Sequence, residues 1–275
     1  MPTKKEIIAG VSGEVQWWIG QRLRKFGELG HGSMAINPFM APLLVGIHAH
    51  ANFEELAEFL IGGHFMVGHS TGFGKLVDEK ILPKVFGTTK LTAAFRKSAP
   101  YNLSVFSEID HLVLQGRENV LLSVKAGRWT IQLGQAMQLN HSLKQLVDLR
   151  TSRNDVTFSK IVVGVFYGTN ETLTDKFNLI RGIRGRVQHD VVDITNHVDV
   201  FAGRRFWAWM NLGETKTQDW VLDGVLDGLS KSRNALQEAA RLLESFKSGF
   251  TKEFEKCIDG DGKIDWHAIL RTING

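Results

Sequence analysis

The chain has 275 residues, of which 43% are hydrophobic, and this length and composition provide for a substantial buried core. The single cysteine, Cys257, excludes an intramolecular disulfide and a thiolate-rich metal site, and it suits a reducing compartment. The apolar runs fall short of the about 20 residues of a membrane span, and the first residues lack the apolar segment of a signal peptide, so we expect a cytoplasmic protein without a membrane partner.

The net charge of +4 is unevenly distributed along the chain. From Lys80 to Arg205 there are 18 Lys and Arg against 10 Asp and Glu, a net charge of +8, which leaves −4 for the remainder. Four of the positive charges, and no acid, lie in residues 81–97. A basic segment of this kind attracts polyanions such as DNA. The alternative is that these charges are solvated on separate faces of the fold.

The N-terminal part of the chain is predicted to be helical. In residues 14–29, "EVQWWIGQRLRKFGEL", apolar side chains recur at spacings of three and four, which is typical of an amphipathic helix. A second helix is expected across residues 52–65, "NFEELAEFLIGGHF", with Asn52 as its cap.

A β-hairpin is predicted in the middle of the chain. Two β-rich runs, residues 107–115 and 119–127, flank the turn-like "GREN". With the turn centred between its arginine and glutamate, Asp110 lies opposite Lys125, and both side chains point to the same face as Ser123. This register brings a carboxylate and an ammonium group together.

A helix and a further strand are expected after the hairpin. Residues 129–149 have helical periodicity, and residues 160–168, "KIVVGVFYG", form a continuous apolar run typical of a strand buried on both faces. A helix between two strands indicates a crossover, so the sheet should be mixed and the fold class α/β. Residues 206–275 are predicted to be helical, and no linker precedes them.

Three apparent motifs fail their requirements. "TGFGKL" at 71–76 lacks the first glycine and the final Ser or Thr of a phosphate-binding loop. "DGDGKIDW" at 259–266 lacks carboxylates at the first and twelfth positions of a calcium loop, and it is interpreted as a turn before the last helix. "HAH" at 48–50 has no other metal ligands at a recognisable spacing.

Asp110, Ser123 and Lys125 have two interpretations on their spacing alone. A carboxylate opposite a lysine can bind a hard divalent cation and place an ammonium beside it, which suits phosphodiester hydrolysis. The alternative is an ordinary cross-strand ion pair, which contributes under about 1 kcal/mol when exposed.

Longer stretches of the sequence resemble a nuclease family. The chain is similar to the PD-(D/E)xK nuclease superfamily and, within it, to the type II restriction endonucleases that cut purine-GGNCC-pyrimidine sites. The resemblance implies a restriction-endonuclease-like core with a mixed central sheet flanked by helices. It also implies one nuclease domain, residues 1–275, with a catalytic core at about 72–168 and helical segments 1–71 and 206–275 packed on it. The stretches that carry it are "INPFM", "TGFGKLVDEKILP", "EIDH", "SVKAGRWTIQL", "IVVGVFYG", "LTDK", "RGI" and "WVL", spread from residue 36 to 222.

The same resemblance implies the site residues. Asp110 matches the aspartate of the family motif and Lys125 its lysine, whereas Ser123 stands where an acid is expected and takes a minor catalytic role. The nearest replacement is the acidic pair Asp78 and Glu79 on a helix-like segment, and Glu79 is favoured. We therefore expect Mg²⁺, with Mn²⁺ as a substitute, to be held by Asp110 and Glu79.

The implied partner is double-stranded DNA, cut at a short GC-rich near-palindrome by a homodimer that works alongside a cognate DNA methyltransferase. Arginines can read guanine in the major groove, although they can also contact phosphates. Two alternatives stay open: a structure-specific repair or junction nuclease, and a catalytically inactive DNA-binding protein, which the serine at position 123 would explain. The candidate DNA-binding residues are Arg181, Arg184, Arg186, Arg204 and Arg205.

Overall fold

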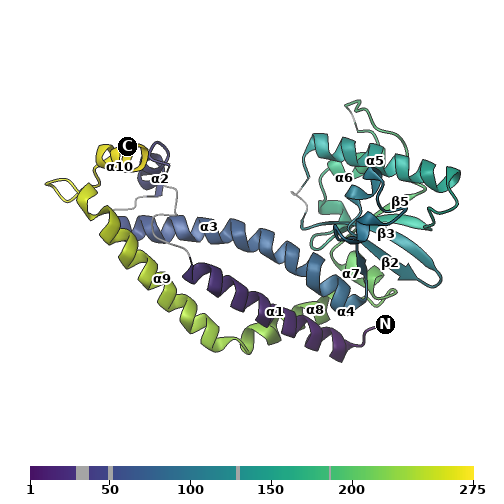
Figure 1. Ribbon diagram of the computed structural model, residues 1–275, viewed down its shortest axis with the longest axis horizontal. Helices are drawn as coiled ribbons and strands as arrows, with labels where there is room; N and C mark the ends of the chain where they lie inside the picture. Colours follow the sequence, from purple (N-terminus) through teal and green to yellow (C-terminus); the bar gives the residue numbers. More distant parts are fainter. Residues whose placement is uncertain (29–36, 49–51, 128–130, 186) are drawn as a thin grey trace. The chain divides into compact units, whose positions relative to one another are not determined.

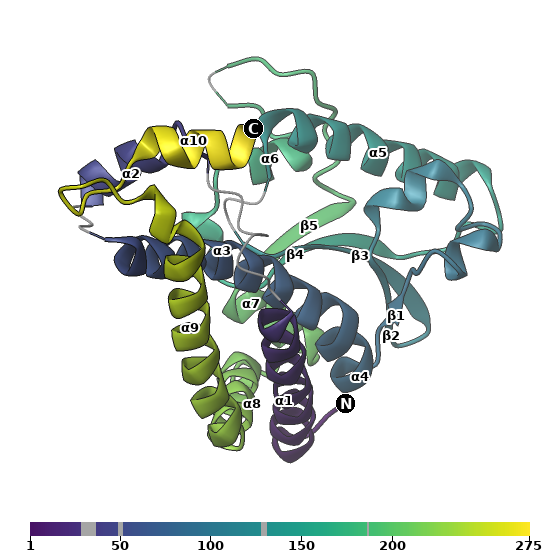
Figure 2. The ribbon, with the colours of Figure 1, turned by 60° about the vertical axis from the view of Figure 1, so that its left-hand side comes forward.

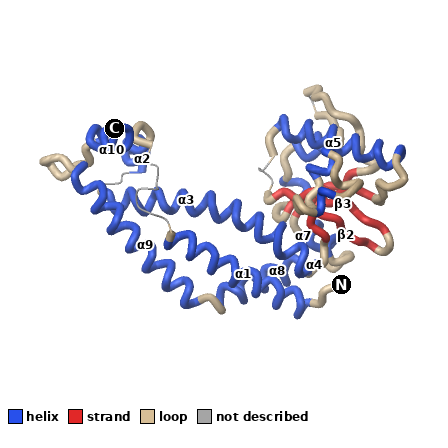
Figure 3. Tube along the Cα trace, in the orientation of Figure 1, coloured by secondary structure: helices blue, strands red, loops and turns tan. Residues whose placement is uncertain are grey.

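The computed structural model describes the whole chain except residues 29–36, 49–51, 128–130 and 186. It divides into two compact units. The sheet unit consists of residues 1–14 and 73–228, and the helical unit consists of residues 15–72 and 229–275. Figures 1 and 3 show the strands of the sheet in the first unit and helices in the second.

The sheet unit is built on a five-stranded mixed sheet in which the strand order follows the chain. β1 (Thr89–Lys90), β2 (His111–Gln115) and β3 (Glu118–Lys125) are antiparallel, whereas β4 (Lys160–Val165) and β5 (Val198–Ala202) run parallel to β3. The predicted α/β class with a mixed central sheet is therefore confirmed. The sheet extends to β5, beyond the core that was expected to end at about residue 168.

Helices cover both faces of this sheet (Figures 1 and 2). α5 (Leu133–Ser152) and α6 (Lys176–Ile180) pack on one face in a shared hydrophobic core with Leu121 and Val163. α7 (Arg204–Met210) follows β5 on the other face. The helix expected at 129–149 thus exists and begins later, after the residues that lie outside the description.

The packing of α7 depends on a glycine in the middle of β4. A Cβ added at Gly164 would lie 2.3 Å from Cε2 of Phe206, whose ring is completely buried. We expect Gly164→Ala to lower the free energy of unfolding by about 1–3 kcal/mol, because the ring or the strand must shift. Urea denaturation followed by circular dichroism measures this. The matched control is Gly134→Ala in the first turn of α5, where the added Cβ meets no atom within 4 Å; equal midpoints for the two variants would contradict the packing argument.

The hairpin of β2 and β3 forms as predicted, but its register differs. His111 pairs with Leu122, whereas the predicted register would pair it with Val124. The two-residue loop between Gln115 and Glu118 explains the shift: Gly116 adopts φ +66°, a conformation that glycine reaches without strain, and lets the chain reverse one residue earlier than expected. Because the shift is two residues on β3, each side of the strand keeps its set of side chains.

The helix predicted from Asn52 is longer than expected. α3 (Phe53–Leu76) begins with the Asn52 carboxamide oxygen accepting the Glu55 N–H at 2.9 Å, which agrees with the predicted cap. It continues into one wide π-helical turn, η2 (Val77–Ile81), and then into α4 (Leu82–Phe86). The wide turn contains both acidic candidates, Asp78 and Glu79.

The helical unit has its own hydrophobic core. Phe246, Phe250 and Phe254 recur every fourth residue along α9 (Arg233–Phe254) and pack with Phe53 of α3. The boundary between the two units falls within α3, and also within α1 (Lys4–Gly27) and α8 (Thr217–Ser230). The single domain predicted for residues 1–275 stays a prediction.

The two rejected motifs of the helical unit have ordinary structures. Asp265 of "DGDGKIDW" caps α10 (Trp266–Asn274) by accepting the backbone N–H groups of His267 and Ala268. His48 is the last residue of α2 (Ala41–His48), and the other two residues of "HAH" lie outside the described residues. None of the helices, as far as the chain is described, is both long and apolar enough to cross a membrane.

Candidate active site at the carboxyl end of β3

Two of the predicted catalytic residues, Asp110 and Lys125, lie at one edge of the sheet. β3, β4 and β5 are parallel, so their carboxyl ends meet at this edge, and the antiparallel β2 begins there. Asp110 directly precedes β2, Lys125 ends β3, and Arg204 follows β5 by two residues. The carboxyl edge of parallel strands is where α/β proteins commonly bind their ligands.

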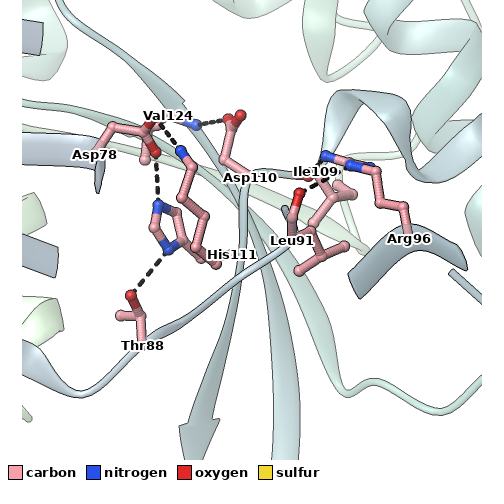
Figure 4. A network of polar contacts seen from close by, with 9 residues as sticks. Asp78, Thr88, Leu91, Arg96, Ile109, Asp110, His111 and Val124 are labelled. Atoms are coloured by element: carbon pink, nitrogen blue, oxygen red, sulfur yellow. Dashed lines mark hydrogen bonds and ion pairs between the residues drawn. The ribbon is translucent and has the colours of Figure 1, made fainter. Parts of the chain in front are cut away.

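Asp110 is held in place by backbone contacts on both sides. Its N–H donates to the Leu122 carbonyl and its carbonyl accepts the Leu91 N–H, each at 2.8 Å. Its carboxylate Oδ2 accepts the Val124 N–H at 2.7 Å, where a ladder bond would otherwise continue (Figure 4). Burial raises the pKa of the Asp110 carboxyl above its usual value, against the lowering effects of the Val124 hydrogen bond and the Lys125 charge.

The predicted cross-strand partner of Lys125 was Asp110, but in the observed register the lysine contacts Ser123 of its own strand. The Lys125 Nζ donates to the Ser123 Oγ at 3.3 Å, and Ser123 is completely buried. Lys125 still acts electrostatically on Asp110, whose pKa it lowers. The lysine also lines a cavity of 260 Å³ together with Glu108, Gln135 and Gln138. The Ser123 hydroxyl is buried and accepts this hydrogen bond, so it fixes the position of the Lys125 ammonium group.

The second carboxylate near Asp110 belongs to Asp78. Its Oδ1 is 2.7 Å from Nε2 of His111, and its Oδ2 accepts from the Lys90 ammonium. The negative charge of Asp78 contributes to raising the pKa of Asp110, so the two carboxylates are electrostatically coupled. Glu79, the residue favoured from the sequence, is exposed. The geometry therefore favours Asp78 over Glu79 as the second acid.

Hydrogen bonding keeps Asp78 ionised. Burial by itself would raise the pKa of Asp78, but the hydrogen bonds from His111 and Lys90 outweigh it and hold the pKa below its usual value. Hydrogen bonds to the charged form thus favour a carboxylate at this position.

His111 is a site residue that the sequence reasoning missed. It is completely buried, and its Nδ1 is 2.9 Å from the Thr88 hydroxyl, so the ring links Thr88 to Asp78 (Figure 4). A histidine bonded on both sides fixes the orientation of the carboxylate that it contacts. The sequence feature that could have indicated this residue is its position directly after Asp110 in "EIDH".

Arg96 holds the chain that leads to Asp110. Its guanidinium donates to the carbonyls of Leu91 at 2.9 Å and Ile109 at 2.5 Å (Figure 4). It also donates to the carbonyl of Phe106. One planar cation thereby joins three points of the segment before β2.

Two of the four cations in the basic stretch at residues 81–97 are paired with acids of the fold. Lys84 pairs with Glu14, Lys90 pairs with Asp78, and Arg96 binds backbone carbonyls. Lys97 is exposed. Attraction of a polyanion to this stretch stays a prediction, which now depends mainly on the exposed Lys84 and Lys97.

The predicted DNA-binding arginines lie in different places. Arg204 and Arg205 are exposed in the first turn of α7, at the edge that holds Asp110 and Lys125. The Arg181 Nε donates at 3.2 Å to the carbonyl of Val198, which begins β5 at the opposite edge. Arg184 donates at 3.0 Å to a carbonyl of its own loop. Arg186 lies outside the described residues.

The carboxylates at this edge that could hold a metal are those of Asp110 and Asp78. Within the described ranges there is no group of three or more His, Cys, Asp and Glu side chains placed to hold a metal. Mg²⁺, however, commonly binds one or two carboxylates and completes its shell with water and substrate phosphate. Asp110 and Asp78 supply two carboxylates, which is the number that such a site needs from the protein.

Comparison with known proteins adds no relative: no protein-family model matches the chain, and no curated protein is significantly similar to it in sequence. The interpretation of the site consequently depends on its own geometry and on the resemblance described above.

Proposed function

We propose that the chain is a type II restriction endonuclease that uses Mg²⁺ to hydrolyse double-stranded DNA at a short GC-rich near-palindrome. The observation that carries the proposal is the geometry at the carboxyl end of β3: the Asp110 carboxylate accepts the N–H of Val124, the residue before Lys125, and His111, the residue after Asp110, bonds the Asp78 carboxylate. Paired acids beside an ammonium group are the arrangement that phosphodiester hydrolysis needs.

Each residue has a separate role in this proposal. Asp110 and Asp78 would hold the metal, and Asp78 replaces Glu79 in that role. When bound, Mg²⁺ supplies a Lewis acid that lowers the pKa of its water and polarises the phosphate. Lys125 orients the attacking water and offsets charge on the phosphate. Ser123 holds the Lys125 ammonium through its hydroxyl.

The partners follow from the proposed substrate. A near-palindromic site requires a homodimer with one site for each strand, a cognate methyltransferase to protect the host DNA, and a cytoplasmic location. Among the candidate arginines, Arg204 and Arg205 lie where they could reach DNA bound at the site, as base readers or phosphate contacts.

Lys125→Ala should slow cleavage by roughly 10²- to 10³-fold, because it removes a charge positioned to stabilise the transition state. Single-turnover cleavage at saturating DNA measures the rate. Ser123→Ala is the matched control: it removes one neutral hydrogen-bond partner of the same ammonium, so its rate should fall by about tenfold or less. Wild-type turnover by Lys125→Ala would exclude the lysine from the reaction.

Digestion of a plasmid with Mg²⁺ tests the function. Discrete fragments whose ends share one sequence support the proposal, whereas nicks placed by DNA structure indicate a repair or junction nuclease. Binding without any cleavage indicates an inactive DNA-binding protein, the candidate that the buried serine at position 123 favours.

A further inference from the structure

Asp78 has both of its carboxylate oxygens engaged inside the protein. Oδ1 is bonded to His111 and Oδ2 to the Lys90 ammonium. Asp110, the other proposed metal ligand, uses only Oδ2 in a described contact, with the Val124 N–H. A divalent cation that approaches the two carboxylates is therefore repelled by the Lys90 ammonium, which is already bound to Asp78.

We propose that Lys90 is an internal counter-ion of Asp78, and that a divalent cation must displace its ammonium group to bind Asp78 and Asp110. The inference rests on the metal site of the proposed function, and it adds a residue that sets the affinity of that site. Two positive charges at one carboxylate oxygen repel each other, so contact of Lys90 with Asp78 opposes binding of the metal there.

Of the two groups on Asp78, Lys90 is the one that can leave. Its side chain is 24% exposed and extends from β1, a strand of two residues, on a flexible four-carbon stem. His111, in contrast, is completely buried and is bonded to Thr88 on its other nitrogen. Displacement of the lysine requires a rotamer change, whereas displacement of the histidine would require opening the core.

This exchange of the Lys90 ammonium for a metal ion weakens metal binding in the wild-type protein, because each ion that binds must break the charge-assisted contact between Lys90 and Asp78. A variant without the Lys90 ammonium has no such competitor, and the carboxylates of Asp78 and Asp110 are then open to the metal. Lys90→Met keeps most of the apolar stem, so it should bind Mn²⁺ about tenfold or more tightly than the wild type does. Lys90→Arg keeps the charge and should remain within about threefold of the wild type.

The test is titration of the full-length protein with Mn²⁺ in the absence of DNA, with free Mn²⁺ followed by electron paramagnetic resonance. Lys97→Met is the matched control, since it removes an exposed lysine of the same stretch and should leave the affinity unchanged. The double variant Lys90→Met/Asp78→Asn should lose the gain, which locates the effect at Asp78. Lys90→Gln replaces Lys90→Met if circular dichroism shows the latter to be unfolded.

Failure of this inference is distinguishable from failure of the proposed function. Equal or weaker Mn²⁺ binding by Lys90→Met and Lys90→Gln overturns the exchange, even if the wild-type protein cuts DNA. A gain that survives Asp78→Asn also overturns it. Tighter binding that depends on Asp78 supports the exchange, even if plasmid digestion shows no cleavage and the proposed reaction fails.

Discussion

Asp110→Asn is expected to abolish DNA cleavage while DNA binding is retained. The carboxylate is proposed to hold the metal, and a metal ion contributes several kcal/mol of transition-state stabilisation, so the loss should reach about a thousandfold or more. The substitution preserves the shape of the side chain and an oxygen that can accept the Val124 N–H, so the frame of the site should persist. Single-turnover cleavage measures the rate, and gel-shift assays in Ca²⁺ and without metal measure binding.

The two measurements for Asp110 separate two roles. Binding should be equal to wild type or tighter without metal, because a carboxylate repels the phosphate that it faces. A folded variant that no longer binds DNA would instead make Asp110 a recognition residue. Cleavage at the wild-type rate would remove Asp110 from the reaction altogether.

The neighbouring acids Asp78 and Glu79 should respond very differently to amide substitution. Asp78→Asn removes a charge that is coupled to Asp110 and should lower both metal affinity and the cleavage rate by about a hundredfold or more. Glu79→Gln changes an exposed side chain and should cut within about threefold of the wild-type rate. The measurement is the Mg²⁺ dependence of the single-turnover rate for both variants.

Each acid is the control for the other, since the two lie in the same wide helical turn. Thermal unfolding should be compared first, because Asp78 also bonds His111 and Lys90. If Glu79→Gln is the inactive variant and Asp78→Asn cuts normally, the second ligand is the residue favoured from the sequence. Normal cleavage by both variants would exclude this helix as the source of the second acid.

Helices and strands could be predicted from the sequence where the pattern of apolar residues was clear. Residues 160–168 contain a buried parallel strand because an uninterrupted apolar run suits a strand covered on both faces. The hairpin was recognisable by its two β-rich runs, but its register was not, since the position of the reversal depends on the backbone conformation of one glycine, Gly116.

The site was less accessible, because its geometry depends on irregular backbone. A regular helix gives no reason to prefer Asp78 to its neighbour, and the wide turn at Val77–Ile81 is a conformation that composition does not reveal. His111 and Lys90 act through contacts with Asp78, a residue distant in sequence from His111. Arg181 illustrates the same difficulty, since nothing in "RGIRGR" indicates that its guanidinium donates to the Val198 carbonyl at the opposite edge of the sheet.

The sequential strand order has a consequence for how the protein folds. Each ladder of the sheet joins strands that are consecutive in the chain, so no strand waits for a distant partner to be inserted beside it. The β2–β3 pair closes through a two-residue loop, so its loop-closure cost in entropy is the lowest of the four ladders. β4 and β5 join the sheet only after long crossovers. We therefore expect the sheet to grow outward from this hairpin, so that the backbone around Asp110 and Lys125 is organised before α7 brings its arginines to the same edge.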